Sequence, residues 1–496
     1  MNVSIIRRIL GYVLILEAVM LILPCIVALI YGEDEVITFV EVSGICLAVG
    51  AAMGLKKPRD NVFYLKEGCV ATALSWIFLS LFGCLPFVFS GAIPDFTNAL
   101  FETVSGFTTT GASILNDVES LPRSILFWRS FTHWIGGMGI LVFLLAIVPL
   151  SGGTGSNINL MKAESPGPTV GKIRPKMRTT ASYLYLMYIA ITVLEIVLLI
   201  AGKMPVFDAV TTAFGTAGTG GFGIKNNSIA GYSPYIQWVV TVFMIAFGVN
   251  FNVYFLLIFG QFRRALSVDE IRWYFILILA STGILFSATY NTHYGASDAL
   301  RHSAFQVASI MTTTGFSTAD FDMWHGAAKT VLVMLMFVGA CAGSTGGGIK
   351  VSRFIVAGKS VLREIRSYVH PKSVENMKMD GKVLDKNTIK ATNIYLITFM
   401  FVYALSMFLV SIEGHDLITN FTSVAATINN IGPGLSLVGP TQNFSFFGTF
   451  SKYIFIFDML AGRLELFPML LIFNPIMWKD TVTQSVRKRR ARKNVK

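Results

Sequence analysis

Long apolar segments are the feature that most constrains the fold of this chain. Ten mainly apolar stretches recur along its 496 residues, and most reach the ~20 residues that a helix needs to cross the bilayer core. They run approximately over residues 9–31, 36–55, 69–90, 125–150, 181–201, 235–260, 273–290, 327–343, 391–412 and 450–473. Only 14% of the residues are charged, whereas soluble domains carry roughly 25%. The sequence therefore predicts an all-α integral membrane protein.

The distribution of basic residues predicts the orientation of the chain. Ten crossings place both termini on one side of the membrane, and that side holds 32 of the 40 lysines and arginines. These lie at Arg7 and Arg8, in residues 56–66, 162–178, 263–272 and 350–390, and in the tail from Lys479. The positive-inside rule then puts both ends in the cytoplasm. The net charge of +12 is thus interpreted as a topology signal, and nucleic acid is not an expected partner.

Four of the segments between crossings repeat one pattern. Each is mildly polar, too short to span the membrane, and ends in a cluster of small residues. The four are PDFTNALFETVSGFTTTGAS (94–113), PVFDAVTTAFGTAGTGGFG (205–223), GASDALRHSAFQVASIMTTTGFS (295–317) and GHDLITNFTSVAATINNIGPG (414–434). Each opens near an aspartate that suits a helix N-cap and closes near a glycine that suits a non-helical backbone. The aspartates are Asp95, Asp208, Asp298 and Asp416, and the glycines are Gly111, Gly221, Gly315 and Gly432.

The repeated pattern predicts the organisation of the chain. Each unit consists of an apolar helix, a short re-entrant helix, a glycine-rich loop and a second apolar helix, arranged fourfold around a common axis. We expect an N-terminal hairpin in 1–60, repeats in 61–160, 161–265, 266–370 and 371–480, and a basic tail in 481–496. The connections 151–178 and 350–390 are expected to be cytoplasmic docking surfaces.

Four re-entrant loops around one axis can together form a binding site for an ion. Non-helical backbone at membrane depth is tolerated only when it is buried in protein or lines a water-filled cavity. Inward-facing carbonyls can replace the hydration shell of a cation, and threonine hydroxyls can add further ligands. Neutral oxygens favour a weakly hydrated monovalent ion over a divalent ion, so potassium is the expected cargo. The alternative for any single cluster is close packing of small residues between helices, but its recurrence in four hairpins favours the filter.

Two features near the predicted pore remain open to two interpretations. The stretch GACAGSTGGGIK (339–350) interrupts the third repeat, either as a flexible plug below the filter or as a plain helix end. Arg463, within LAGRLELFP, is interpreted either as a positive barrier facing the pore or as an ion-pair partner of Glu465 or Asp458. No catalytic constellation is present, so an enzyme is not expected.

These motifs together resemble the superfamily of Trk, Ktr and HKT potassium transporters. TTTGAS, GTGGFG, TTTGFS and NNIGPG are similar to its four filters, CAGSTGGGIK to its intramembrane gating loop, and AGRLELFP to its pore-arginine segment. The extra N-terminal hairpin is similar to the TrkH type. The resemblance implies four M1–P-loop–M2 repeats around a pseudo-fourfold pore, a homodimer in the bacterial inner membrane, and gating by a cytoplasmic nucleotide-binding RCK subunit (TrkA-like).

The resemblance also assigns candidate residues. The potassium filter would be formed by Thr109, Thr110, Gly111, Thr219, Gly220, Gly221, Thr313, Thr314, Gly315, Asn430, Ile431 and Gly432. The gate would be formed by Gly343, Ser344, Thr345, Gly346, Gly347, Gly348, Lys350 and Arg463. All four key positions are glycine, which the family associates with potassium preference.

Two other functions remain as alternatives. The potassium-translocating subunit of a P-type pump resembles the same superfamily, although the basic loops and the intact GSTGGGIK stretch favour the Trk type. A cation-coupled solute carrier would use acidic residues within helices, for which Glu17, Glu195 and Asp458 are candidates. That function would leave the four re-entrant loops unexplained.

Overall fold

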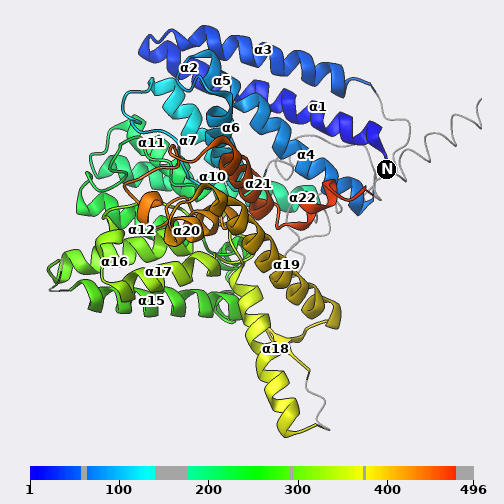
Figure 1. The fold of residues 1–496 in the computed structure, drawn as a ribbon, viewed down its shortest axis with the longest axis vertical. Helices are drawn as coiled ribbons and strands as arrows, with labels where there is room; N and C mark the ends of the chain where they lie inside the picture. Colours follow the sequence, from blue (N-terminus) through cyan, green and yellow to red (C-terminus); the bar gives the residue numbers. More distant parts are fainter. Residues whose placement is uncertain (57–63, 140–176, 291, 293, 372–375, 476–496) are drawn as a thin grey trace, which may run out of the picture.

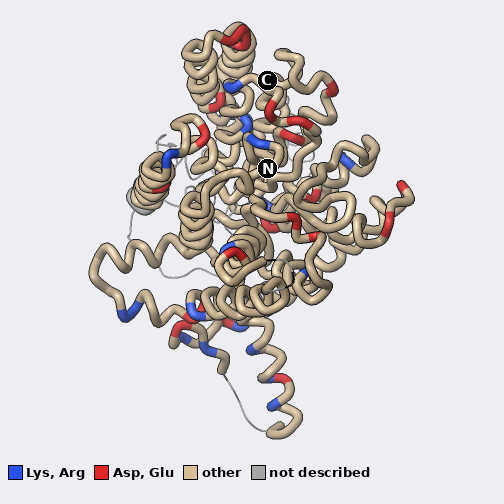
Figure 2. The backbone as a smooth tube through the Cα atoms, turned by 90° about the vertical axis from the view of Figure 1, so that its left-hand side faces the viewer, with Lys and Arg blue, Asp and Glu red and all other residues tan. Residues whose placement is uncertain are grey.

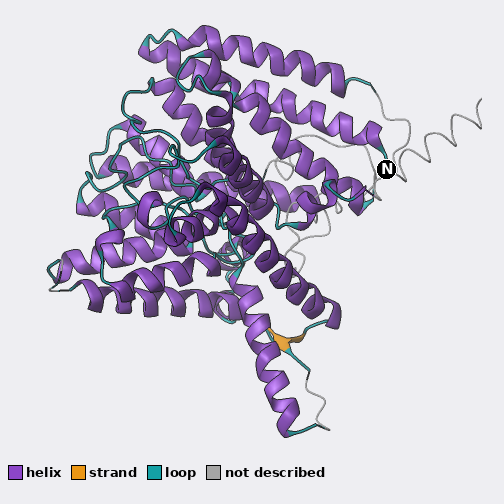
Figure 3. Cartoon of the chain, in the orientation of Figure 1, coloured by secondary structure: helices purple, strands orange, loops and turns teal. Residues whose placement is uncertain are grey.

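The computed structural model describes residues 1–56, 64–139, 177–290, 292, 294–371 and 376–475. The described part is almost entirely helical, with one small two-stranded sheet (Figure 3). The basic tail 481–496 and most of the connection 151–178 lie outside these residues, as do the repeat boundaries at 60/61, 160/161 and 480/481.

The N-terminal hairpin precedes the first repeat. It consists of α1 (Val3–Met20), α2 (Ile22–Tyr31) and α3 (Glu35–Gly54), of which α1 and α2 form one apolar span. A Cβ on Gly11 would lie 2.7 Å from the carbonyl oxygen of Gly50, so the α1 and α3 backbones approach closely. Small residues at such a contact are typical of helices packed in a membrane.

Each repeat supplies a first helix, a short pore helix and a second helix (Figure 1). Repeat 1 has α4 (Leu65–Gly83), α5 (Leu85–Phe89), α6 (Phe96–Phe107) and α7 (Arg123–Gly137). Repeat 2 has α10 (Met177–Ala201), α11 (Val206–Gly218), α12 (Pro234–Phe247), α13 (Phe251–Ile258) and α14 (Phe262–Leu266). Repeat 3 has α15 (Asp269–Thr289), α16 (Ala296–Met311), η1 (Phe321–Met323), α17 (Gly326–Val338) and α18 (Val351–Val369). Repeat 4 has α19 (Lys386–Val410), η2 (Ser411–Glu413), α20 (Leu417–Ile428), η3 (Ser436–Val438), α21 (Thr449–Arg463) and α22 (Phe467–Ile472).

Several helices are long and apolar enough to cross a membrane. Six in the described part meet this condition, or seven if α12 and α13, bent by 93° at their junction, count as one broken span. Large apolar side chains face outward on them, such as Ile30, Leu279 and Ile397, each at least 70% exposed. Outward apolar side chains of this size are expected where lipid replaces water. The chain is therefore a multi-pass membrane protein.

The second helix of every repeat is interrupted, whereas the sequence predicted an interruption only in the third repeat, at residues 339–350. α7, α12, α17 and α21 are only 13 to 15 residues long. Helix α7 ends at Gly137, α12 ends just before Gly248, and α17 ends just before Gly339. Helix α21 ends shortly before Glu465 and Leu466, which both have positive φ. The stretches predicted over 125–150, 235–260, 327–343 and 450–473 are therefore not uninterrupted spans within the residues that the structure describes.

The connection 350–390 is more ordered than a cytoplasmic loop was expected to be. α18 projects from the other described helices, with β1 (Lys378–Met379) and β2 (Lys382–Val383) beside it (Figure 1, Figure 3). Basic positions lie along this projection (Figure 2). Lys359 in α18 forms an ion pair of 2.9 Å with Asp269 at the start of α15, so the projection is anchored at its base.

The expected aspartate N-caps occur at two of the four pore helices. Asp95 caps α6 by accepting from the N–H of Asn98 at 2.8 Å, and Asp416 caps α20 by accepting from the N–H of Thr419 at 3.0 Å. Asp208 and Asp298 instead lie within the first turns of α11 and α16. There their charge still favours the positive end of the helix dipole.

We expect Asp95→Ala and Asp416→Ala each to lower the free energy of unfolding by about 1 kcal/mol, because each removes the oxygen that caps a pore helix. Thermal unfolding in detergent measures this change. Asp34→Ala is the matched control, since Asp34 is also an exposed N-cap aspartate, at the start of α3, but its side chain makes no cap hydrogen bond. An equal loss in the control would contradict the capping role.

The same cap predicts a pH dependence. Hydrogen bonds from Thr419 hold the pKa of the Asp416 carboxyl below its usual range. Its stabilisation is therefore complete above the unfolded-state pKa of about 4 and is lost as the pH falls through the lower pKa of the folded state. The stability difference between wild type and Asp416→Ala should shrink in that acidic range.

Candidate ion-conducting site

Each pore helix leads into a short loop with the same backbone geometry. We call residues 109–111, 219–221, 313–315 and 430–432 filters 1 to 4. The first residue of each filter has a φ of 56° to 60°, and its final glycine has a φ of 74° to 97°. A positive φ is costly for threonine and asparagine, so four recurrences of it indicate a conformation that the fold imposes.

The amide groups of the first two residues of each filter point back to its own pore helix. In filter 1, the N–H of Thr109 donates to Gly106 O at 3.1 Å and the N–H of Thr110 donates to Ser105 O at 2.9 Å. The same two hydrogen bonds recur at the corresponding residues of filters 2, 3 and 4, with lengths of 2.8 to 3.2 Å. None of the twelve filter carbonyls accepts a hydrogen bond from the described residues. The filters therefore expose their carbonyl oxygens, while the amides of their first two residues are bonded to the pore helices.

Glycine contacts show that the four filters form a closed ring. A Cβ on Gly111 would overlap the Gly220 carbonyl oxygen of filter 2, and one on Gly221 would overlap the Thr314 oxygen of filter 3. A Cβ on Gly315 would overlap the Ile431 oxygen of filter 4. The ring closes at Gly432, where a Cβ would lie 2.8 Å from the Thr110 oxygen of filter 1. Each key glycine thus makes room for a carbonyl of the next filter.

Most filter threonine hydroxyls also form hydrogen bonds within the protein. Thr110 Oγ1 lies 2.8 Å from Thr108 Oγ1, and Thr314 Oγ1 lies 2.7 Å from Thr312 Oγ1. Thr219 donates to Gly218 O at 2.6 Å. These hydroxyls brace the loops, so the backbone carbonyls are the principal free oxygens.

Filters 2 and 4, which lack the TTTG pattern, are supported in other ways. A Cβ on Gly220 would overlap the imidazole of His133 from α7, so the ring occupies the space of the missing side chain. In filter 4, Asn430 Nδ2 donates to Thr110 Oγ1 and to Met459 O, both at 2.9 Å. The pairing of His133 with Gly220 has no signal in the local sequence.

The 339–350 loop lies directly against the filters. The N–H of Gly347 donates to Thr313 Oγ1 at 2.6 Å. A Cβ on Gly346 would lie 2.9 Å from Thr312 O, and one on Gly347 would lie 2.7 Å from Asn429 O. The loop therefore packs at the pore-helix ends that lead into filters 3 and 4, rather than entering solvent as a plain helix end would.

Glu270 of α15 anchors both ends of this loop. Its Oε1 atom accepts from the N–H of Ala342 at 2.8 Å and from the N–H of Ser352 at 3.0 Å, and the residue is fully buried. Lys350 folds back and donates from Nζ to Gly346 O and Gly347 O. The sequence analysis missed Glu270, because it lies 69 or more positions before the loop.

The loop also bonds to the interrupted second helices. The N–H of Cys341 donates to Gly248 O at 3.1 Å, and Thr345 Oγ1 donates to Phe247 O at 3.2 Å. The N–H of Phe251 in turn donates to Gly343 O at 3.0 Å. The break between α12 and α13 is therefore filled by the loop.

Arg463 joins the loop to the end of α7. It donates to Thr345 O at 2.8 Å, to Gly137 O at 2.9 Å, and also to Gly136 O. The two ion-pair partners considered for it are engaged elsewhere: Glu465 pairs with Arg353, and Asp458 accepts from Ser406 at 2.6 Å. The geometry thus gives Arg463 contacts to backbone carbonyls at the base of the site.

Comparisons with known proteins agree with this architecture. A family model described as TrkH, cation transport protein, matches residues 37–485. The chain is 36% identical over 490 residues to the Trk system potassium uptake protein TrkH of Salmonella typhimurium and to that of Escherichia coli K12, covering 97% of this chain and 100% of each relative. The crystal structure of the potassium transporter TrkH from Vibrio parahaemolyticus matches with a TM-score of 0.86 at 31% identity, covering 96% of this chain and 100% of that one.

The full-length match, the fourfold arrangement of pore helices and the closed ring of filters lead to one assignment. The chain belongs to the TrkH family of cation transport proteins.

Proposed function

We propose that this protein carries potassium into the cell across the cytoplasmic membrane, with both termini in the cytoplasm. The observation that carries the proposal is the ring in which each key glycine faces a carbonyl of the next filter. A ring of neutral oxygens that accept no hydrogen bond from the described residues can replace the hydration shell of potassium. The relatives named for potassium uptake support the choice of ion.

The filter proposal assigns selectivity to the backbone of residues 109–111, 219–221, 313–315 and 430–432. The pore helices end at these loops, so the negative ends of their dipoles lie beside the ring and favour a cation. The filter holds no carboxylate, which agrees with a monovalent cargo.

We further propose that residues 343–348, together with Lys350 and Arg463, form a gate below the filter. The supporting contacts are the hydrogen bond from Gly347 to Thr313 and the donation by Arg463 to Thr345 O. The first places the loop against filter 3. The second places a positive charge beside it, at the ends of the interrupted helices.

A homodimer and an RCK-type regulatory subunit complete the proposal. α18 presents Val361, Leu362, Ile365 and Tyr368, each more than half exposed, next to Arg363 and Arg366. Mixed apolar and basic residues on a projecting helix suit a protein partner. The Trk system naming of the relatives supports association with other Trk components.

Gly111→Ser and Gly315→Ser are expected to lower the K⁺/Na⁺ flux ratio by about tenfold or more, equivalent to about 1.4 kcal/mol. The added side chain would displace a carbonyl of the neighbouring filter. Flux of K⁺, Rb⁺, Na⁺ and Li⁺ into reconstituted vesicles measures the ratio. Gly283→Ser is the control, because nothing lies within 4 Å of the position of its Cβ. Unchanged selectivity in both folded filter variants would refute the assignment.

Deleting residues 343–348 is expected to raise K⁺ flux in the absence of any partner, because it removes the obstruction. Arg463→Gln should raise flux by a smaller amount, since it cuts the tie to Thr345 and removes a positive charge from the path. Neither change should alter the K⁺/Na⁺ ratio. Flux is measured per folded protein alongside the melting temperature. A wild-type or lower flux from a stable deletion variant would refute the proposal that this loop is a gate.

Arg363→Glu combined with Arg366→Glu is expected to weaken co-purification with the regulatory subunit at least about tenfold while the membrane fold stays intact. Lys359 is left unchanged, because its ion pair with Asp269 anchors α18. Lys203→Glu, outside α18, is the control for reversal of a basic charge elsewhere on the protein. Undiminished binding by the double variant would reject docking on this helix.

A further inference from the structure

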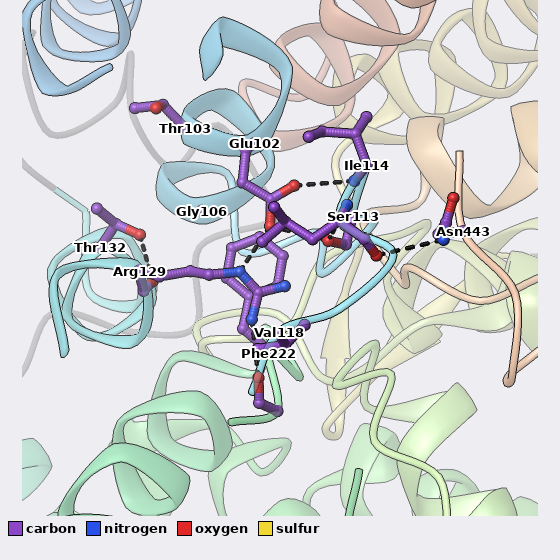
Figure 4. A network of polar contacts seen from close by, with 12 residues as sticks. Glu102, Thr103, Gly106, Ser113, Ile114, Val118, Arg129, Thr132, Phe222 and Asn443 are labelled. Atoms are coloured by element: carbon purple, nitrogen blue, oxygen red, sulfur yellow. Dashed lines mark hydrogen bonds and ion pairs between the residues drawn. The ribbon is translucent and has the colours of Figure 1, made fainter. Parts of the chain in front are cut away.

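A buried ion pair lies behind filter 1. Arg129 Nε of α7 is 2.6 Å from Glu102 Oε1 of the pore helix α6, and the two side chains are 3% and 0% exposed. Figure 4 shows the pair at the centre of a polar network that neither the filter nor the gate includes. A charged pair so fully removed from water costs desolvation free energy, so its contacts must compensate for that cost.

Glu102 ties its own filter to its own pore helix. Its Oε1 accepts from the hydroxyl of Ser113 and its Oε2 accepts from the N–H of Ile114, both at 3.0 Å (Figure 4). Ser113 and Ile114 directly follow the filter, two and three residues after Gly111. The carboxylate therefore fixes the chain where it leaves filter 1.

Arg129 reaches from the same carboxylate to filter 2. Its Nη1 donates to Gly223 O at 2.8 Å, and its guanidinium lies 3.6 Å from the centre of the Phe222 ring. Phe222 and Gly223 directly follow Gly221. One planar side chain thus connects the chain leaving filter 1 with the chain leaving filter 2.

His133, one turn along the same face of α7, makes a second connection between these filters. The N–H of Phe222 donates to its Nε2 at 3.2 Å, so its Nδ1 carries the proton and donates to Gly106 O at 2.8 Å. Both ring nitrogens are used in the neutral form. Arg129 and His133 together hold filter 2 against the pore helix of repeat 1.

The corresponding positions of the other repeats hold no charge. Glu102 lies nine residues before its key glycine, and the equivalent residues are Thr212, Gln306 and Ser423. Filters 2 and 3 are joined by the N–H of Ile229 donating to Ser317 O, and filters 4 and 1 by the N–H of Phe444 donating to Ser113 O. Among the described residues, filters 1 and 2 are the only neighbouring filters that an ion pair connects.

We propose that Glu102 and Arg129 are specificity-determining positioning residues that fix the spacing of filters 1 and 2. A smaller ion such as Na⁺ would draw the carbonyls inward, and the braced pair resists that contraction. A buried ion pair stabilises a fold little compared with apolar residues of similar size, which agrees with a role in geometry rather than in stability. The inference rests on the proposed potassium transport and adds residues outside the filter to it.

The test compares K⁺ and Na⁺ flux per folded protein in vesicles, with melting temperatures on the same preparations. Glu102→Gln and Arg129→Met are each expected to lower the K⁺/Na⁺ ratio about tenfold, and the double variant is expected to lower it no further, because both act through one contact. The double variant carries no unpaired buried charge, so it keeps the test valid if a single variant fails to fold. Arg129→Lys should lower the K⁺/Na⁺ ratio by a smaller factor, because lysine keeps the ion pair but lacks the planar guanidinium.

Gln306→Met is the position-matched control on pore helix α16 and should retain the wild-type ratio, because the only hydrogen bond from its side chain to the described residues is a long one, of 3.4 Å, to Ala319 O. A wild-type protein without K⁺ preference would refute the proposed function itself. A selective wild type with an equally selective, folded double variant would overturn this inference alone. An equal loss of selectivity in Gln306→Met would also overturn it, because the charge would then have no special role.

Discussion

Unpaired backbone carbonyls are the constraint on which the described structure depends. A carbonyl among membrane-spanning helices has no bulk water to bond, so it needs another partner or it destabilises the fold. The filters hold twelve such carbonyls by directing the amides of their first two residues back to the pore helices and by turning the chain through left-handed conformations. The key glycines allow neighbouring filters to approach without a Cβ between them.

The interrupted second helices pose the same problem at the base of the pore. A helix end leaves carbonyls without an intrahelical partner, and here four helices end around one region. The 339–350 loop and Arg463 satisfy those carbonyls at α7 and α12. Movement of the loop would therefore break the hydrogen bonds to these carbonyls, and water would then have to hydrogen-bond to them instead. This links opening of the loop to hydration of the pore below the filter, since each released group costs free energy until it is solvated.

The sequence predicted what periodicity and local motifs encode, and missed what distant residues decide. The membrane class and the short pore helices follow from apolar length and from repeated Asp and Gly positions, and the structure confirms the helical, multi-pass class. The break after α21 was missed although Gly462 and Pro468 flank it, because the residues that adopt positive φ there, Glu465 and Leu466, are not glycines. The anchor at Glu270 and the pairing of Gly220 with His133 were also missed, because both join residues far apart in sequence.

The fourfold symmetry of the site is a property of its backbone and not of its side chains. All four filters share φ values and amide contacts, yet TTTG occurs in only two of them. Where the motif departs, another element takes over the support: an imidazole stands beside Gly220, and Asn430 reaches to Thr110. A substitution of a side chain behind one filter can therefore alter the position of that filter alone. The support of the ring is thus unequal around the axis, because different side chains hold its four filters.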